Sequence, residues 1–263
     1  MRLQVLVAAV NADVRTLAEK MNLESEAIIV NQCEGFGYET YEYQGKRIQC
    51  YSMAERGVGL NRNTALMRAE GDICLFSDED IVFDTGYEEK VLGAFEANPD
   101  ADIITFNFEV DASRKTYDNQ KSGRIRWYNY GRYPTYAVAA RTEVLHRAGV
   151  SFSLLFGGGA KYSNGEDSLF LHDCLKKGLH LYADTAKLGR EVYRESSWFT
   201  GYHQKFFFDR GVLYPYLYGP LAKLWALRFL LTKRTVLCQE VGVRQAYAWM
   251  KAGIREGRRL RVR

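Results

Sequence analysis

Hydrophobic runs of strand length alternate with helical patterns through the first hundred residues of the chain. The pattern predicts strands at residues 4–10, 27–30, 47–52, 73–76 and 102–108, and helices at residues 13–21, 61–70 and 87–97. Gly71 and Pro99 follow two of these helices, as is typical of residues that end a helix. Strands that alternate with helices of about ten residues predict a mostly parallel, Rossmann-like α/β sheet covered by helices on both faces.

The regular alternation fades in the second half of the chain. Residues 111–132 are polar, aromatic and basic and are predicted to form a long loop, followed by a strand at 136–140, a helix at 142–148 and a helix that opens at Glu166. Beyond Trp198 the chain is rich in aromatic residues, and the apolar run 221–233 is too short to span a bilayer. We therefore expect an α/β domain over residues 1–212 and a helical, basic extension over residues 213–263.

The composition is that of a soluble globular protein, with 47% hydrophobic and 26% charged residues among 263. The five cysteines are odd in number and include no CxxC pair, which favours reduced thiols in a cytoplasmic protein. The apolar run near the N-terminus is short and ends at Asn11. It therefore indicates a core strand rather than a signal peptide.

The net charge of +4 is modest but unevenly placed, because residues 251–263 hold six basic residues and one acid, Glu256. With residues 221–233, this tail is a candidate for contact with an anionic membrane surface, which would place the protein at the inner face of the cell membrane. Packing of the same helices on the α/β domain is the alternative. Nucleic acid is not expected as a partner, since basic residues are not spread over one face among aromatics.

Three consecutive acids, Asp78, Glu79 and Asp80, follow the strand predicted at residues 73–76. Ligands of such sheets bind at the carboxyl ends of the strands. An Asp-x-Asp at that place can hold a divalent cation that takes its remaining ligands from water and a diphosphate. The alternative is an acidic surface turn without a metal.

A second acid pair, Glu166 and Asp167, follows the glycine run 157–159 at the start of a predicted helix. A carboxylate there could act as a general base that accepts a proton from an attacking hydroxyl. The alternative is stabilisation of the first helical turn by negative charge. His203 lies in a polar and aromatic segment and is a candidate third metal ligand, with a structural role as the alternative.

These blocks, in this order, resemble the family-2 glycosyltransferases. The segment "RGVGLNRNTALMRAEGDICLFSDEDIVF" is similar to the central block of that family, and the matching residues are Gly59, Arg62, Asn63, Ala69, Gly71, Asp72, Asp78 and Asp80. The segments "YAVAARTEVLHRAG" and "GGGAKYSNGEDSLFLHDCLKKG" resemble the family's strand and helix before the acceptor site and its Glu-Asp block. The resemblance covers residues 1–212 and implies the GT-A fold.

The resemblance also implies roles for individual residues. Asp78 and Asp80 would hold Mn²⁺ or Mg²⁺ and contact the ribose and diphosphate of a nucleotide sugar, with a UDP-sugar favoured. Asp167 would deprotonate the acceptor hydroxyl, and Glu166 would bind the acceptor or hold the loop. The metal ligands would be Asp78, Asp80 and His203, and the donor contacts would be Ala9, Asn11, Asn31, Gln32, Gly59, Arg62, Asn63, Asp78, Glu79 and Arg210.

Two features depart from the family pattern. Where the family commonly has an acid near the nucleotide base, this chain reads "IIVNQCEG", and the amide of Asn31 or Gln32 could instead bind a pyrimidine. The chain also lacks the Gln-x-x-Arg-Trp motif and the membrane helices of processive synthases, which favours the addition of a single sugar.

The sequence thus predicts inverting transfer of a hexose-like unit from a nucleoside diphosphate sugar to a hydroxyl of a glycan or lipid-linked acceptor, in bacterial-type surface polysaccharide synthesis. One alternative is a relative that binds sugar nucleotide or glycan without catalysis. The other is a nucleotidyltransferase, but "VAAVNADVRT" offers no glycine-rich, basic phosphate loop after the first strand. The aromatic residues of segment 127–136 could stack on acceptor sugars or pack in the core.

Overall fold

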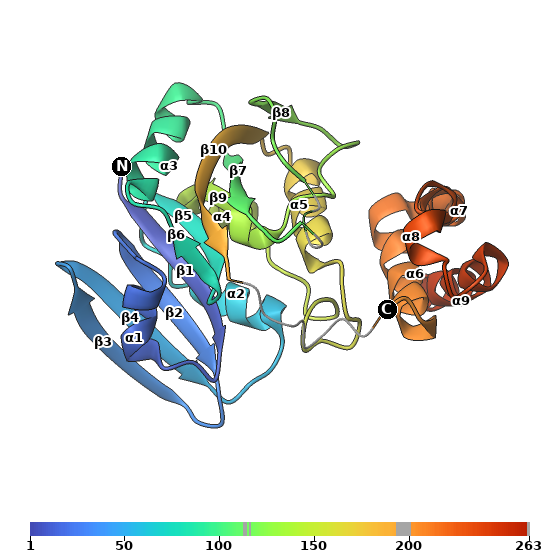
Figure 1. Cartoon of the computed structure of the whole chain (residues 1–263), viewed down its shortest axis with the longest axis horizontal. Helices are drawn as coiled ribbons and strands as arrows, with labels where there is room; N and C mark the ends of the chain where they lie inside the picture. Colours follow the sequence, from blue (N-terminus) through green and yellow to red (C-terminus); the bar gives the residue numbers. More distant parts are fainter. Residues whose placement is uncertain (113–114, 116, 193–200, 262–263) are drawn as a thin grey trace.

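A mixed sheet forms the centre of the protein in the computed structural model, which describes residues 1–112, 115, 117–192 and 201–261 (Figure 1). Across the sheet the strands are β3 (Gly37–Tyr43), β4 (Lys46–Met53), β2 (Glu26–Gln32), β1 (Leu3–Val10), β5 (Ile73–Asp78), β9 (Val138–Arg141), β7 (Ile103–Glu109), β10 (Leu181–Glu191) and β6 (Ile81–Phe83), and β8 (Gly123–Ile125) pairs with β10. In the described part of the chain, β1, β2, β4, β5, β7 and β10 share one direction. The predicted α/β sheet with mostly parallel strands is confirmed.

The hydrophobic pattern did not predict β3, β6, β8 or β10. β3 is an edge strand that, among the described strands, pairs with β4 alone, so its alternating tyrosines and polar residues lie largely at the surface. β9 was predicted as a strand, but it runs antiparallel between β5 and β7. Strand direction depends on the partner that a strand meets in space, and a local pattern does not report it.

Helices cover both faces of the sheet, as predicted. The hydrophobic cluster on one face joins α1 (Val14–Lys20) and α3 (Tyr87–Ala97) to alternate residues of β1 such as Val5. The cluster on the other face joins α2 (Val58–Leu66), α4 (Thr142–Ala148) and α5 (Glu166–Lys176) to the intervening residues such as Leu6. The helix predicted at residues 61–70 corresponds to α2, which begins and ends a few residues earlier than predicted.

A separate helical unit lies beside the α/β domain (Figure 1). Its elements are α6 (Gln204–Tyr218), η2 (Gly219–Leu221), α7 (Ala222–Thr232), α8 (Arg234–Leu237) and α9 (Val243–Arg261). At Gly211, Gly253 and Gly257, a side chain would overlap the backbone of the facing helix, so glycine permits the close contact between α6 and α9. The boundary expected at residue 212 lies inside α6, which packs mainly against the other helices of this unit.

Part of the basic tail packs on this same unit. Arg258 and Arg261 donate hydrogen bonds to the carbonyl oxygens of Pro220 and Pro215 near the end of α6. Trp198 and Arg263 lie outside the described residues. In the part of the chain that is described, no helix has both the length and the apolar character needed to cross a membrane. All five cysteines are unpaired, as expected.

Candidate active site

The carboxyl ends of three neighbouring parallel strands bring predicted site residues to one edge of the sheet. The strand register pairs Ala8 with Asp78 and Val10 with Gln32, so β1, β2 and β5 end together. A cavity of about 490 Å³ opens there, and Asn11, Glu79 and Asp80 lie in its wall. This position at the strand ends is where ligands of open α/β sheets bind.

Asp78 is bound to a buried arginine instead of lining this cavity. The side chain of Arg62, on α2, is 5% exposed, and its Nη2 lies 2.9 Å from Oδ1 of Asp78. Nη1 of the same guanidinium lies 3.1 Å from Oδ1 of Asp167 and 3.6 Å from Oε1 of Glu166. One arginine therefore joins the two acid pairs that the sequence singled out separately.

The environment changes the proton affinities of these groups. Burial by itself lowers the pKa of Arg62, but the charges of Asp78, Asp167 and Glu166 outweigh it, so the pKa is raised and the side chain stays cationic. Burial, and next the charge of Asp167, raise the pKa of Glu166 to about 7. Burial also raises the pKa of Asp167, although Arg62 and a hydrogen bond from Thr135 oppose this effect.

Asp167 is oriented from two sides at the start of α5. Arg62 binds its Oδ1, and the hydroxyl of Thr135, the first residue of η1 (Thr135–Ala137), donates to the same atom. The side chain remains 31% exposed, so a substrate hydroxyl can reach it. Thr135 was missed by the sequence analysis, because a single threonine just before a predicted strand carries no signal of its own.

Glycines allow the Glu-Asp pair to sit against its surroundings. Gly165, the N-cap residue just before α5, has a φ of 108°, and Gly157 has a φ of 109°. A side chain on Gly157 would come within 2.8 Å of Cδ of Glu166. The two acids do lie in the first turn of α5, as the capping alternative expects, but their side chains are bound to Arg62 and Thr135.

Gly59 and Asn63 dock α2 on a neighbouring loop rather than line the cavity. The amide of Asn63 donates to the carbonyl oxygen of Phe152 at 2.9 Å and accepts from its backbone N–H at 2.7 Å. A side chain on Gly59 would overlap the carbonyl oxygen of Ser153. Asn61, which the sequence analysis did not single out, donates to the carbonyl of Val30 at 2.8 Å and so ties α2 to β2.

The residues predicted to meet the nucleotide base are engaged with backbone. The amide of Asn31 accepts from the N–H and donates to the carbonyl of Ala12, both at 3.0 Å. Gln32 donates to the carbonyl of Gly57 at 3.0 Å. Ala9 is fully buried in the core. Asn31 and Gln32 thus hold neighbouring loops in place, and none of the three residues lines the cavity.

His203 and Arg210 also lie in other settings than expected. His203 precedes α6, and its Nδ1 accepts from the N–H of Lys205 at 3.2 Å. Arg210 donates to Oδ1 of Asn164 at 3.2 Å, and its guanidinium stacks on Phe229. Within the described residues, no three His, Cys, Asp or Glu side chains gather as a metal site, so the trio Asp78, Asp80 and His203 is not assembled.

The Asp-x-Asp pair by itself offers a donor set of the right kind. Carboxylate oxygens are the ligands that Mg²⁺ and Mn²⁺ prefer, and Mg²⁺ commonly keeps waters and is completed by substrate phosphates. Asp78 and Asp80, at the exit of β5 beside the cavity, fit a metal that is held by few protein ligands. A metal enclosed by protein ligands alone does not fit these residues.

Solved structures with the same architecture define the fold class as GT-A. TarS from S. aureus in complex with UDP-GlcNAc superposes with a TM-score of 0.61 and 14% identity, over 91% of this chain and 74% of that chain. The mannosyltransferase PcManGT from Pyrobaculum calidifontis, in complex with GDP-Man and Mn²⁺, gives 0.50 and 14%, over 97% and 86%. The fold is therefore that of the GT-A glycosyltransferases.

The family follows from the sequence match. The sequence model of glycosyl transferase family 2 matches residues 9–157, which are more than half of the chain. The chain belongs to this family, which confirms the resemblance inferred from its motifs. A comparison with curated proteins gives no match.

Proposed function

We propose that this protein is an inverting glycosyltransferase that moves one sugar from a nucleoside diphosphate sugar to a hydroxyl of a glycan or lipid-linked acceptor. The observation that carries the proposal is the position of Arg62, whose guanidinium contacts both Asp78 of the Asp-x-Asp and Asp167 of the Glu-Asp pair. A donor-binding acid and a candidate base are thereby held on either side of one cation. Family membership supports the same reaction class.

In the proposed reaction, Asp167 accepts the proton of the acceptor hydroxyl while the hydroxyl oxygen attacks the anomeric carbon. The bond from that carbon to the diphosphate oxygen breaks, and the nucleoside diphosphate leaves with the electron pair. A single in-line displacement inverts the anomeric configuration. Arg62 and Thr135 keep the carboxylate of Asp167 oriented during this step.

A divalent metal, Mn²⁺ or Mg²⁺, would be held by Asp78 and Asp80. When bound, it supplies positive charge that stabilises the leaving diphosphate. The cavity lined by Asn11, Glu79 and Asp80 is the proposed place of the nucleotide. A UDP-sugar is favoured as donor, and the bound UDP-GlcNAc of TarS is consistent with that choice, whereas PcManGT holds GDP-Man.

We place the protein in the cytoplasm, peripheral to the cell membrane, where it would serve surface polysaccharide synthesis. Leu221, Leu224 and Leu231 are more than half exposed on η2 and α7, with Lys223 beside them, which is a suitable surface for an anionic bilayer. Changing the three leucines to serine should reduce cosedimentation with phosphatidylglycerol vesicles. Unchanged cosedimentation would remove the membrane from the proposal.

The test of the function is donor hydrolysis over a panel of UDP-, GDP- and dTDP-sugars, with and without Mn²⁺ or Mg²⁺. We expect one nucleotide to be released in a metal-dependent manner and this release to be lost in Asp80→Ala. Glu96→Gln removes an exposed acid on α3 that does not line the cavity, and it serves as the charge-matched control. Tight binding of a donor without turnover, even with glycan acceptors added, would instead support the non-catalytic alternative. If no donor binds, the proposal is wrong.

A further inference from the structure

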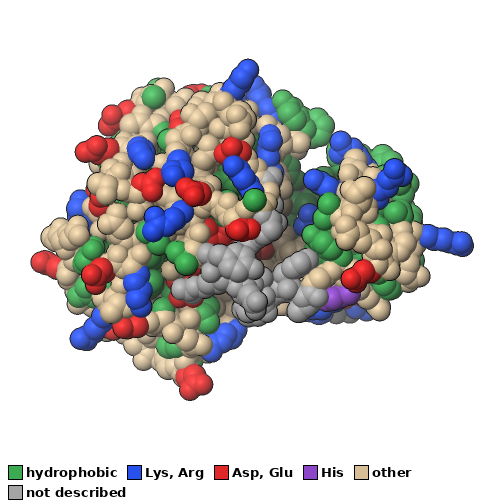
Figure 2. Space-filling view, viewed as in Figure 1, with side chains coloured by type: hydrophobic (Ala, Val, Ile, Leu, Met, Phe, Trp, Pro, Cys, Tyr) green, Lys and Arg blue, Asp and Glu red, His purple; other side chains and the backbone are tan. Residues whose placement is uncertain are grey.

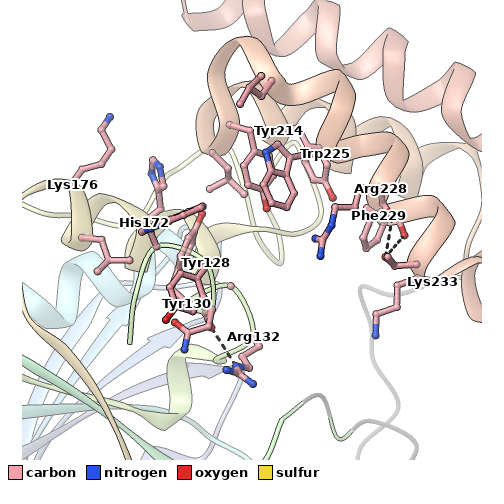
Figure 3. A pocket seen from close by; sticks show the side chains of 18 residues that line it. Tyr128, Tyr130, Arg132, His172, Lys176, Tyr214, Trp225, Arg228, Phe229 and Lys233 are labelled. Atoms are coloured by element: carbon pink, nitrogen blue, oxygen red, sulfur yellow. Dashed lines mark hydrogen bonds between the residues drawn. The ribbon is translucent and has the colours of Figure 1, made fainter. Parts of the chain in front are cut away.

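A second and larger cleft separates the α/β domain from the helical unit. It has a volume of about 850 Å³, and its walls come from α5 and residues 127–132 on one side and from α6 and α7 on the other (Figure 3). Figure 2 shows the molecule hollowed between these two bodies, with Lys and Arg side chains on both sides. Within the described part of the chain, this cleft shares no lining residue with the cavity beside Asp80.

Aromatic rings form much of the cleft wall. Tyr128 is 69% exposed, and Tyr130 lies deeper, with its ring centroid 5.8 Å from that of His172. On the opposite wall, Trp225 stacks on Tyr218 with a centroid distance of 5.0 Å. Exposed, preoriented aromatic faces of this kind suit the apolar faces of sugar rings, because they bury area at a low cost in conformational entropy.

The polar groups of the cleft are biased toward positive charge. Arg132 extends from one wall, and Arg228 and Lys233 extend from the other, into the space between them (Figure 3). Lys176 also lines the cleft, and no Asp or Glu among the described residues does. Among the described residues, none of these four side chains forms an ion pair with a carboxylate. The cleft therefore presents unneutralised positive charge to a ligand.

The cleft leads toward the candidate base. His172 lines it, and Asp167 lies five residues earlier on α5, a rise of about 7.5 Å along the helix axis. The loop of the cleft wall continues to the base, because Gly131 lies against Ser168 and Thr135 donates to Asp167. Asp167 itself is not among the lining residues, but its neighbour Ser168 touches the loop that forms one wall, so one end of the cleft lies beside the candidate base.

We propose that this cleft binds the acceptor and that the acceptor is a glycan carrying a phosphate group. The proposal rests on the proposed function, since it assigns the acceptor of the same reaction. Sugar rings would stack on Tyr128 and the other aromatic residues, while Arg132, Arg228 and Lys233 bind the phosphate. Three cations match a dianionic phosphate better than a carboxylate, and arginine is suited to bidentate phosphate binding.

The test compares trehalose 6-phosphate with trehalose, a matched pair that differs by one phosphate, in calorimetric titrations of the full chain. We expect the phosphorylated sugar to bind at least ten times more tightly. The double variant Arg228→Gln/Lys233→Gln should lose most of this preference, and Arg132→Gln on the opposite wall should lose part of it. Arg255→Gln, an exposed cation on α9 outside the cleft, is the matched control and should keep it.

Three results would overturn the proposal. The first is equal binding of the two sugars. The second is unchanged binding in both cleft variants with unaltered thermal unfolding. The third, in titrations with Mn²⁺, is loss of the preference in Asp80→Asn, which would place the phosphate at the metal of the donor cavity. Vesicles containing phosphatidylglycerol separate a lipid source of phosphate from a glycan source. If the cleft variants lose vesicle binding but keep trehalose 6-phosphate, the cations serve a lipid surface. Donor hydrolysis by the unaltered chain tests the reaction itself, so the two proposals fail separately.

Discussion

Nη1 of Arg62 lies 3.1 Å from Oδ1 of Asp167, although 105 residues separate the two in the chain. The other terminal nitrogen of the same guanidinium holds Asp78 at 2.9 Å. A buried arginine between three carboxylates keeps those acids close together without strong repulsion. It also connects the end of β5, where the donor is proposed to bind, with the start of α5, where the base is proposed.

Removal of this arginine should destabilise the fold. Arg62→Ala leaves three partly buried carboxylates without their buried cation, and we expect the free energy of unfolding in urea to fall by about 3 kcal/mol. Arg15→Ala is the control, because Arg15 pairs with Glu39 at a similar distance of 3.0 Å but its side chain is 79% exposed. That change should cost less than about 1 kcal/mol. Equal losses in the two variants would contradict the view that burial sets the value of the Arg62 contacts.

Substitution of Asp167 should reduce turnover far more than substitution of Glu166. In Asp167→Asn the amide cannot accept a proton, so we expect kcat for transfer to fall by about 100- to 10,000-fold with little change in the donor KM. Glu166→Gln should lower kcat far less, since Glu166 is not the proposed base. Steady-state kinetics with the identified donor measure both variants. The reverse order of effects would assign the proton transfer to Glu166, whose pKa of about 7 also suits a base.

The raised pKa of Glu166 predicts a pH-dependent difference in stability. Its pKa is about 7 in the folded chain against an ordinary value of 4.5, so the folded state binds the proton more tightly than the unfolded state. The unfolding free energy of the wild type should therefore fall as the pH rises from 4.5 to 7. Glu166→Gln lacks this loss and should be more stable than the wild type by about 3 kcal/mol at pH 8, and nearly equal to it at pH 4. Urea unfolding at both pH values measures the difference, and parallel curves would refute the prediction.

Gly59 should tolerate no side chain, because α2 approaches Ser153 closely at this position. We expect Gly59→Ala to lower the free energy of unfolding by about 1–3 kcal/mol, since the backbone of one segment must move. Gly93→Ala is the matched control, because Gly93 is exposed within α3 and an added Cβ would meet no other atom within 4 Å. That change should stabilise the protein by up to about 1 kcal/mol through helix propensity. Thermal unfolding of the two variants checks the sign of each effect.

The sequence by itself determined the features that depend on neighbouring residues. The bounds of α3 and α4 agree with the predicted helices at 87–97 and 142–148, because apolar periodicity and the following Pro99 and Gly149 are local signals. The acidic exit of β5 and the acids that open α5 were likewise visible as short motifs. Together with the ordered blocks around them, they were sufficient to identify the family.

Only the tertiary structure decided which groups meet. Asn31 and Gln32 have amides that could bind a base, but Ala12 and Gly57 come near enough in the fold to take their hydrogen bonds. The contact of Arg62 with both acid pairs and the cleft between Tyr128 and Trp225 likewise bring together segments far apart in the chain. A side chain's partner is set by long-range packing and by the need to pair buried polar groups, and neither is encoded in the spacing of residues along the chain.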